Sequence, residues 1–101
     1  PRTIEVMDFY ADTFGEYPDK AITAFKPYVG HTLGASALLE TAILLLCMDN
    51  NAVLPTLNTA AVDPMIKINL ETRRRSLNVR AALKTCCAFA GYTAAAIFKK
   101  V

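Results

Sequence analysis

"FKPYVGHTLGASALLETAILLLCM", Phe25–Met48, contains the only histidine of the chain and its longest apolar run. The second half of this stretch, Ala35–Met48, is apolar around the whole helical circumference, and Glu40 is its one charge. A helix that is apolar on all sides is typical of a buried core element. We therefore expect a buried helix here, with His31 in the connection that leads into it.

The flanking sequence predicts a helix and several short strands. Upstream, residues 2–14 have the spacing of an amphipathic helix that stops at Gly15, and Ala21–Phe25 is a candidate for a short buried strand. Downstream, Pro55 makes residues 52–58 an edge or a loop. Further strands are expected around residues 66–70, 78–87 and 93–101. This order predicts an α/β fold in which a mixed or antiparallel sheet packs against the buried helix.

The composition is apolar for so short a chain. Its 101 residues are 53% hydrophobic and 20% charged, with a mean hydropathy of +0.28. A domain of this size buries a limited share of its surface, so we expect a partner subunit or another part of the fold to cover some apolar residues. The start at Pro1 rather than Met fits an excised fragment or a processed product.

The net charge of +2 is too small to indicate nucleic acid as a partner. The one basic cluster, Arg73–Arg75, is interpreted as a solvated loop or strand end in preference to a docking patch for an acidic partner. No signal peptide is visible, and the longest apolar run, Thr41–Met48, is far shorter than the roughly 18 residues that a membrane span needs. We expect a cytoplasmic protein without a membrane span.

The three cysteines, Cys47, Cys86 and Cys87, are odd in number and two of them are adjacent. The single histidine has no Cys-x-x-Cys beside it, so no metal site is predicted. We expect free, buried thiols in a reducing compartment.

The segment around His31 is suited to chemistry as well as to structure. Gly30 and Gly34 allow a tight backbone path. A neutral imidazole in such a loop can donate a hydrogen bond to a developing oxyanion, and Lys26 would disfavour its protonation. Glu40, about two turns into the helix, could pair with Lys26. From these residues alone a structural histidine remains the commoner interpretation.

Three segments share their order and spelling with one enzyme family. "K-x-x-x-G-H-x-L-G-A" runs from Lys26 to Ala35, and Glu40 follows in the same helix. "VLPTLN" at residues 53–58 precedes an Asp-Pro pair, and "CCAFAGYTAAAIFKK" occupies residues 86–100. Together they resemble the C-terminal part of the β-ketoacyl synthases. Thiolases share a G-H-x-x-G-A-S element, but Lys26 and "LPTLN" favour the synthases.

The resemblance implies a thiolase-like fold and a decarboxylative Claisen condensation of malonyl-acyl carrier protein with an acyl thioester, in fatty-acid or polyketide synthesis. It implies that His31 stabilises the enolate, that Lys26 is an electrostatic and orienting residue supported by Glu40, and that Phe89 gates the acyl site. It implies no cofactor beyond the phosphopantetheine carried by the acyl carrier protein. The implied partners are that carrier and a second synthase subunit, in a homo-oligomer or a heterodimer.

The chain also departs from the family. The nucleophilic cysteine and the first catalytic histidine are missing, so residues 1–101 are expected to be a single fragment that lacks the nucleophile-bearing half and is inactive alone. Ala88 and Ala90 replace the glycines beside the gating phenylalanine, and Tyr92-Thr93 replaces Thr-Asn. The alternatives are a non-catalytic partner subunit of the chain-length-factor type and a small interaction module with a chance motif. Retention of Lys26 and His31 favours an active parent.

Overall fold

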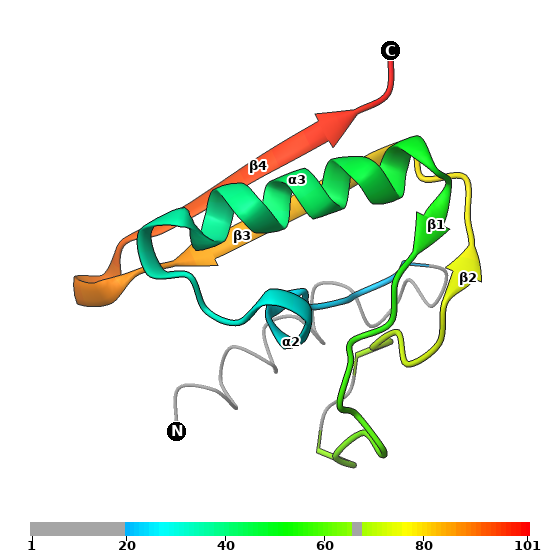
Figure 1. Ribbon diagram of the computed structural model, residues 1–101, viewed down its shortest axis with the longest axis horizontal. Coiled ribbons are helices and arrows are strands. Elements are labelled where there is room, and N and C mark those ends of the chain that lie inside the picture. The colour runs from blue at the N-terminus through cyan, green and yellow to red at the C-terminus, as the bar shows by residue number, and fades with distance from the viewer. Residues whose placement is uncertain (1–19, 66–67) are drawn as a thin grey trace.

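One long helix lies along a β-hairpin in the computed structural model, which describes residues 20–65 and 68–101 (Figure 1). The helix is α3, Ser36–Asp49, within one residue of the predicted bounds. The helix expected over residues 2–14 lies outside the described residues. The other elements are α2 (Lys26–Val29), the 3-10 turns η1 (Leu33–Ala35) and η2 (Phe89–Gly91), and the strands β1 (Ala52–Val53), β2 (Arg75–Ser76), β3 (Ala81–Cys87) and β4 (Thr93–Lys99).

The hairpin consists of β3 and β4, paired antiparallel from Ala81↔Lys99 to Cys87↔Thr93. Both strands were predicted from the sequence, although β3 begins three residues later than expected. Along β3 half-buried and exposed residues alternate, as they do in a strand with one covered face. The half-buried positions are Ala82, Lys84 and Cys86.

The prediction that α3 is buried on all sides is wrong for the described part of the chain. Its buried residues are Ser36, Glu40, Cys47 and Met48. Leu38 is 75% exposed and Leu46 is 62% exposed. The reason is that the described elements pack against one side of the helix, so its apolar circumference exceeds what they cover. No helix within residues 20–65 and 68–101 is long and apolar enough to cross a membrane.

The segment before α2 is extended but pairs at one residue only. Ile22 forms a parallel bridge with Leu70, so the strand predicted over Ala21–Phe25 is reduced to a single bridge. The strand expected around residues 66–70 is likewise present only at Leu70, and residues 66–67 are not described. A side-chain hydrogen bond holds this segment where a regular ladder is missing. The Thr23 hydroxyl donates to the Leu54 carbonyl at 2.8 Å.

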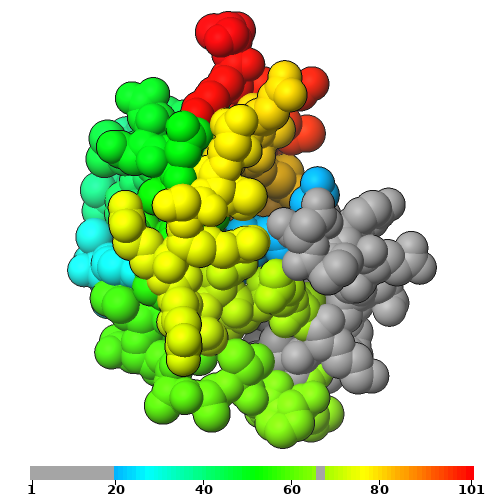
Figure 2. All heavy atoms as spheres, turned by 90° about the vertical axis from the view of Figure 1, so that its right-hand side faces the viewer, coloured from blue at the N-terminus to red at the C-terminus, as the bar shows by residue number. Residues whose placement is uncertain are grey.

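β1 and β2 form a second, short antiparallel pair at the end of α3 (Figure 1). β2 and the residues after it, in yellow, cross the face shown in Figure 2, with the C-terminal residues in red above them. Arg75 in β2 pairs with the buried Glu71 at 2.8 Å, whereas Arg73 and Arg74 are exposed. The prediction of a solvated loop or strand end is confirmed for Arg73 and Arg74 and is wrong for Arg75, which is half-buried because it pairs with Glu71.

The apolar core lies where α3 meets β1. Its buried members are Phe25, Cys47, Met48, Ala52 and Val53. These residues come from three segments of the sequence, so the core fixes the segment before α2 against the end of α3 and the start of β1.

We expect Met48→Ala to lower the free energy of unfolding by about 2–5 kcal/mol, because Met48 is 4% exposed and alanine would leave a cavity. Leu38→Ala on the exposed side of the same helix is the control, with an expected change below about 0.5 kcal/mol. Urea unfolding of both variants measures the difference. Equal losses would show that the core does not lie at Met48.

Candidate functional site

A short helix and a glycine position the segment that carries Lys26 and His31. α2 has four residues, with Pro27 in its first turn, and ends at Gly30. Gly30 has φ +74°, a conformation that L side chains rarely adopt, although a Cβ there would meet nothing within 4 Å. The glycine is therefore needed for the backbone path and not for space. This path turns the chain away from α2 and toward the start of α3.

The Leu-Pro-Thr-Leu-Asn segment, residues 54–58, also holds α2 in place through hydrogen bonds. The Tyr28 hydroxyl donates to the Pro55 carbonyl, and the Thr56 side-chain oxygen accepts from the Ala24 backbone N–H at 3.0 Å. Together with the Thr23 bond, these contacts hold the residues on both sides of Lys26. The Leu-Pro-Thr-Leu-Asn segment therefore holds the backbone around Lys26 in place.

Glu40 joins Lys26 to the hairpin. The Lys26 Nζ lies 2.8 Å from Glu40 Oε1, and the Lys84 Nζ lies 2.8 Å from Glu40 Oε2. The Ser36 hydroxyl also donates to Oε1, at 3.3 Å. The predicted Lys26–Glu40 pair is therefore present, and it is one half of a carboxylate bridge between α2 and β3.

The Glu40 carboxylate is held in its charged form. Glu40 is 5% exposed, and this burial by itself raises its pKa. Hydrogen bonds and positive charge from Lys26 and Lys84 outweigh burial and leave the pKa of Glu40 below its usual range. At neutral pH the cluster therefore contains one carboxylate and two ammonium groups.

Lys84 was not identified from the sequence. Its signal is the two-residue alternation of β3, which places a lysine in the same row as the half-buried Ala82 and Cys86. A charged residue on the covered face of a strand needs a partner of opposite charge. The choice of Glu40 as that partner depends on how α3 lies along the hairpin, which strand periodicity does not reveal.

His31 is exposed and lies between α2 and η1. Its Nδ1 accepts the backbone N–H of Leu33 at 3.1 Å. A neutral imidazole that accepts at Nδ1 carries its proton on Nε2. The Nε2–H of His31 is therefore available as a donor, and the described contacts include no hydrogen bond from His31 to Lys26 or Glu40.

Phe89 lies in η2, the turn of the hairpin, and is 90% exposed. The Lys84–Glu40 pair brings this end of the hairpin beside the start of α3, as Figure 1 shows. Ala90 adopts φ +59° and Gly91 φ +78°, whereas Ala88 is extended at φ −118°. Of the two alanines that replace family glycines, only Ala90 therefore has a backbone that favours glycine.

The cysteines are free, as predicted, but they are not all buried. Cys47 is buried, Cys86 is half-buried and Cys87 is exposed. Cys87 is exposed because odd positions of β3 face away from α3. Burial raises the pKa of the Cys47 thiol, which disfavours the nucleophilic thiolate. Within the described residues no cluster of His, Cys, Asp or Glu could hold a metal ion.

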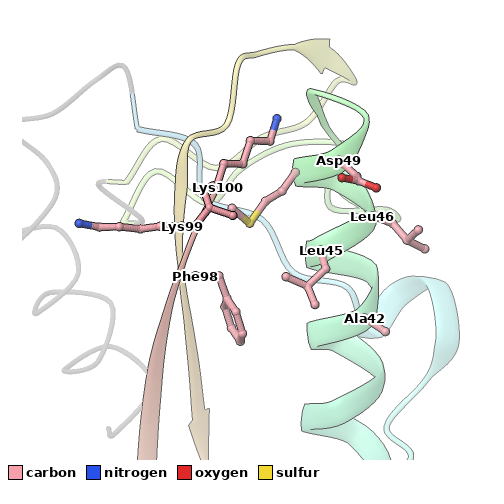
Figure 3. Close-up of a pocket in the computed structure, with 9 residues that line it drawn as sticks. Ala42, Leu45, Leu46, Asp49, Phe98, Lys99 and Lys100 are labelled. Carbon is pink, nitrogen blue, oxygen red and sulfur yellow. The ribbon is translucent and has the colours of Figure 1, made fainter.

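An open groove of about 770 Å³ lies between the second half of α3 and the end of β4. Figure 3 shows Leu45 and Phe98 directed toward each other across it, while Lys99 extends away and Lys100 extends toward the end of α3, where it donates to the Asn51 side-chain oxygen. The groove lies at the opposite end of α3 from Glu40 and His31. Its lining is mainly apolar, so it is not where the proton and charge chemistry of the site is located.

The comparison with protein families agrees with the motifs. The family model described as "Beta-ketoacyl synthase, C-terminal domain" matches residues 4–60, more than half of the chain. The chain belongs to this family, and its fold is thiolase-like. The predicted α/β fold class and the resemblance to the C-terminal part of a β-ketoacyl synthase are thereby confirmed.

Among curated proteins the chain is 32% identical over 94 residues to "Actinorhodin polyketide putative beta-ketoacyl synthase 1" of Streptomyces coelicolor, with 89% of the chain and 20% of that protein covered. It is 27% identical over 90 residues to chloroplastic "3-oxoacyl-[acyl-carrier-protein] synthase II" of Arabidopsis thaliana, with coverages of 87% and 17%. It is 28% identical over 91 residues to "3-oxoacyl-[acyl-carrier-protein] synthase 2" of Staphylococcus aureus, with coverages of 88% and 22%. The chain spans about a fifth of the length of these relatives.

We expect Glu40→Gln to destabilise the fold by about 1–3 kcal/mol at pH 7, through the loss of hydrogen bonds to charged groups. The folded-state pKa of Glu40 lies below its ordinary value of 4.5, so the stabilisation is complete above pH 4.5 and is lost as the pH falls through the lowered pKa. Urea unfolding at a series of pH values should therefore show the two proteins converging in acid. Asp49→Asn, an exposed site on the same helix, is the control. A constant difference between Glu40→Gln and the parent down to pH 2 would contradict the pairing.

Two matched glycine substitutions test the turn. Ala90→Gly should raise the free energy of unfolding by about 0.5 kcal/mol, because relief of the positive φ exceeds the added entropy of the unfolded chain. Ala88→Gly should lower it by about 0.5–1 kcal/mol, because its extended backbone suits alanine. Thermal or urea unfolding gives both values. The same sign for both variants would mean that the turn does not have this conformation.

Proposed function

We propose that the chain forms part of the active site of a β-ketoacyl-acyl carrier protein synthase, which condenses malonyl-acyl carrier protein with an acyl thioester in fatty-acid or polyketide synthesis. The observation that supports this most is the Lys26–Glu40 ion pair, whose lysine lies five residues before an imidazole that accepts at Nδ1 and so carries its proton on Nε2. The membership of the family and the names of the relatives support the same activity.

His31 would act on the negative charge that develops at the malonyl thioester. When the bond between the carboxylate and the α-carbon breaks, carbon dioxide leaves and the electron pair forms an enolate with charge on the thioester oxygen. The Nε2–H of His31 can donate to that oxygen without giving up a full proton. The enolate carbon then attacks the acyl thioester, whose sulfur belongs to a cysteine outside this chain, and the thiolate leaves.

Lys26 and Phe89 would act beside this step. The Lys26 side chain is 50% exposed, and its ammonium is held by Glu40 at 2.8 Å. A positive charge there stabilises the ionised substrate and the enolate. Phe89 is a large apolar side chain on an exposed turn at the same end of the hairpin, which is suited to contact with an acyl chain. The proposed partners are the acyl carrier protein, which brings the phosphopantetheine arm, and a second synthase subunit.

A second candidate is a non-catalytic subunit that shapes the pocket of an active partner. The observation in its favour is the turn, where Ala90 stands at a positive φ that a mobile glycine-rich gate would accommodate more easily. The intact Lys26–Glu40 pair favours the active synthase instead, because a subunit without chemistry has no need of an oriented ammonium.

The test is decarboxylation of malonyl-acyl carrier protein by the full polypeptide that contains this chain. His31→Ala should lower kcat about 10²- to 10³-fold, the usual effect of removing one oxyanion donor, while KM changes little. Thr32→Ala, the adjacent exposed residue, is the control and should keep the parent activity. An active parent whose His31→Ala variant keeps full kcat would overturn the assignment. The isolated chain should be inactive, and turnover by it that is lost on His31→Ala would contradict that expectation.

A further inference from the structure

The two lysines on Glu40 differ in how they are held. Lys84 stands on β3, which is paired with β4 along its whole length, and its side chain is 16% exposed. Its Nζ also donates to the Thr85 carbonyl at 2.6 Å. Lys26 stands on a four-residue helix, and its side chain is 50% exposed. Lys84 is thus the fixed partner of the carboxylate and Lys26 is the accessible one.

The pairing of separate oxygens has a consequence for Lys26. Lys26 contacts Oε1 and Lys84 contacts Oε2, so neither ammonium blocks the other. If Glu40 had Lys26 alone, any movement of that lysine toward a substrate would leave a buried carboxylate without a cation, which is strongly unfavourable. With Lys84 in place, Glu40 keeps a cation and the Ser36 hydroxyl throughout.

We propose that Lys84 is a positioning residue, which holds the Glu40 carboxylate charged and fixed from the sheet side so that Lys26 can turn toward an anionic substrate group. Among residues 20–65 and 68–101, the charged and hydroxyl groups facing Glu40 are Lys26 from α2, Lys84 from β3 and Ser36 from α3. Two ammonium groups and one carboxylate leave a net charge of +1, so the accessible lysine retains attraction for a carboxylate. The catalytic part of this inference rests on the proposed function; the role of Lys84 in holding Glu40 does not.

The test compares variants of the full polypeptide with selectively ¹³C-labelled glutamate carboxyls, with Glu40 assigned by the loss of its signal in Glu40→Gln. Lys84→Met keeps the length of the side chain and removes the charge, Lys84→Arg keeps the charge, and Lys99→Met on the paired strand is the matched control. Lys84→Met should raise the titration midpoint of Glu40. Lys26→Met should leave Glu40 titrating below its usual range, because Lys84 remains. Lys84→Arg and Lys99→Met should titrate like the parent.

The activity measurement is the pH dependence of kcat for malonyl-acyl carrier protein decarboxylation. Lys84→Met should lower kcat on the order of tenfold to a hundredfold through misplacement of Lys26 and move the acid limb to higher pH, with KM nearly unchanged. Lys84→Arg should restore most of the rate and the parent pH profile.

Three results would overturn the inference: a Glu40 titration unchanged by Lys84→Met, parent kcat and pH profile in that variant, or no recovery with Lys84→Arg. A parent polypeptide that does not decarboxylate the substrate overturns the proposed function instead. In that case the Lys26→Met titration decides the role of Lys84. If Glu40 in Lys26→Met titrates below its usual range, the role of Lys84 is supported. If Glu40 titrates above that range, the role of Lys84 is overturned.

Discussion

The buried carboxylate of Glu40 on α3 joins the elements of this site through its ion pairs. A charge removed from water must be matched by opposite charge and hydrogen bonds, or it shifts to its neutral form. Here the match comes from Lys26 on α2 and Lys84 on β3, each at 2.8 Å. The electrostatic requirement of one side chain therefore fixes how a short helix, a long helix and a hairpin lie against one another.

The second constraint is the backbone before α2. Residues from Ile22 onward run between the segment around Leu70 and the segment around Thr56, joined by the parallel bridge, by the Thr23 hydroxyl and by the Ala24 N–H. Such contacts use hydroxyls where a regular sheet would use backbone pairs. They let the chain leave the extended conformation immediately and begin a helix at Lys26. The position of the lysine is thus determined by residues about thirty positions away in the sequence.

The parts of the site that the sequence revealed are those whose signals are local. The apolar run marked α3, the alternation and spacing marked β3 and β4, and Gly30 marked the turn before His31. The Lys26–Glu40 pair also came from the motif. Lys84 was missed because its partner is determined by packing between elements. The exposed side of α3 was not predicted because composition does not reveal how many layers cover a helix. The strand before Lys26 was overestimated because a short apolar run does not show whether a ladder will form.

The outer edge of β4 has a further consequence. Among the described residues β4 pairs only with β3, so its other row of backbone N–H and C=O groups faces away from any strand. Ile97 beside this edge is 70% exposed. An open, regular edge with apolar side chains is a template on which another polypeptide can add a strand. The hairpin that anchors Lys84 thus also offers an edge to which another strand could pair, and a charged or proline substitution on β4 would block that pairing.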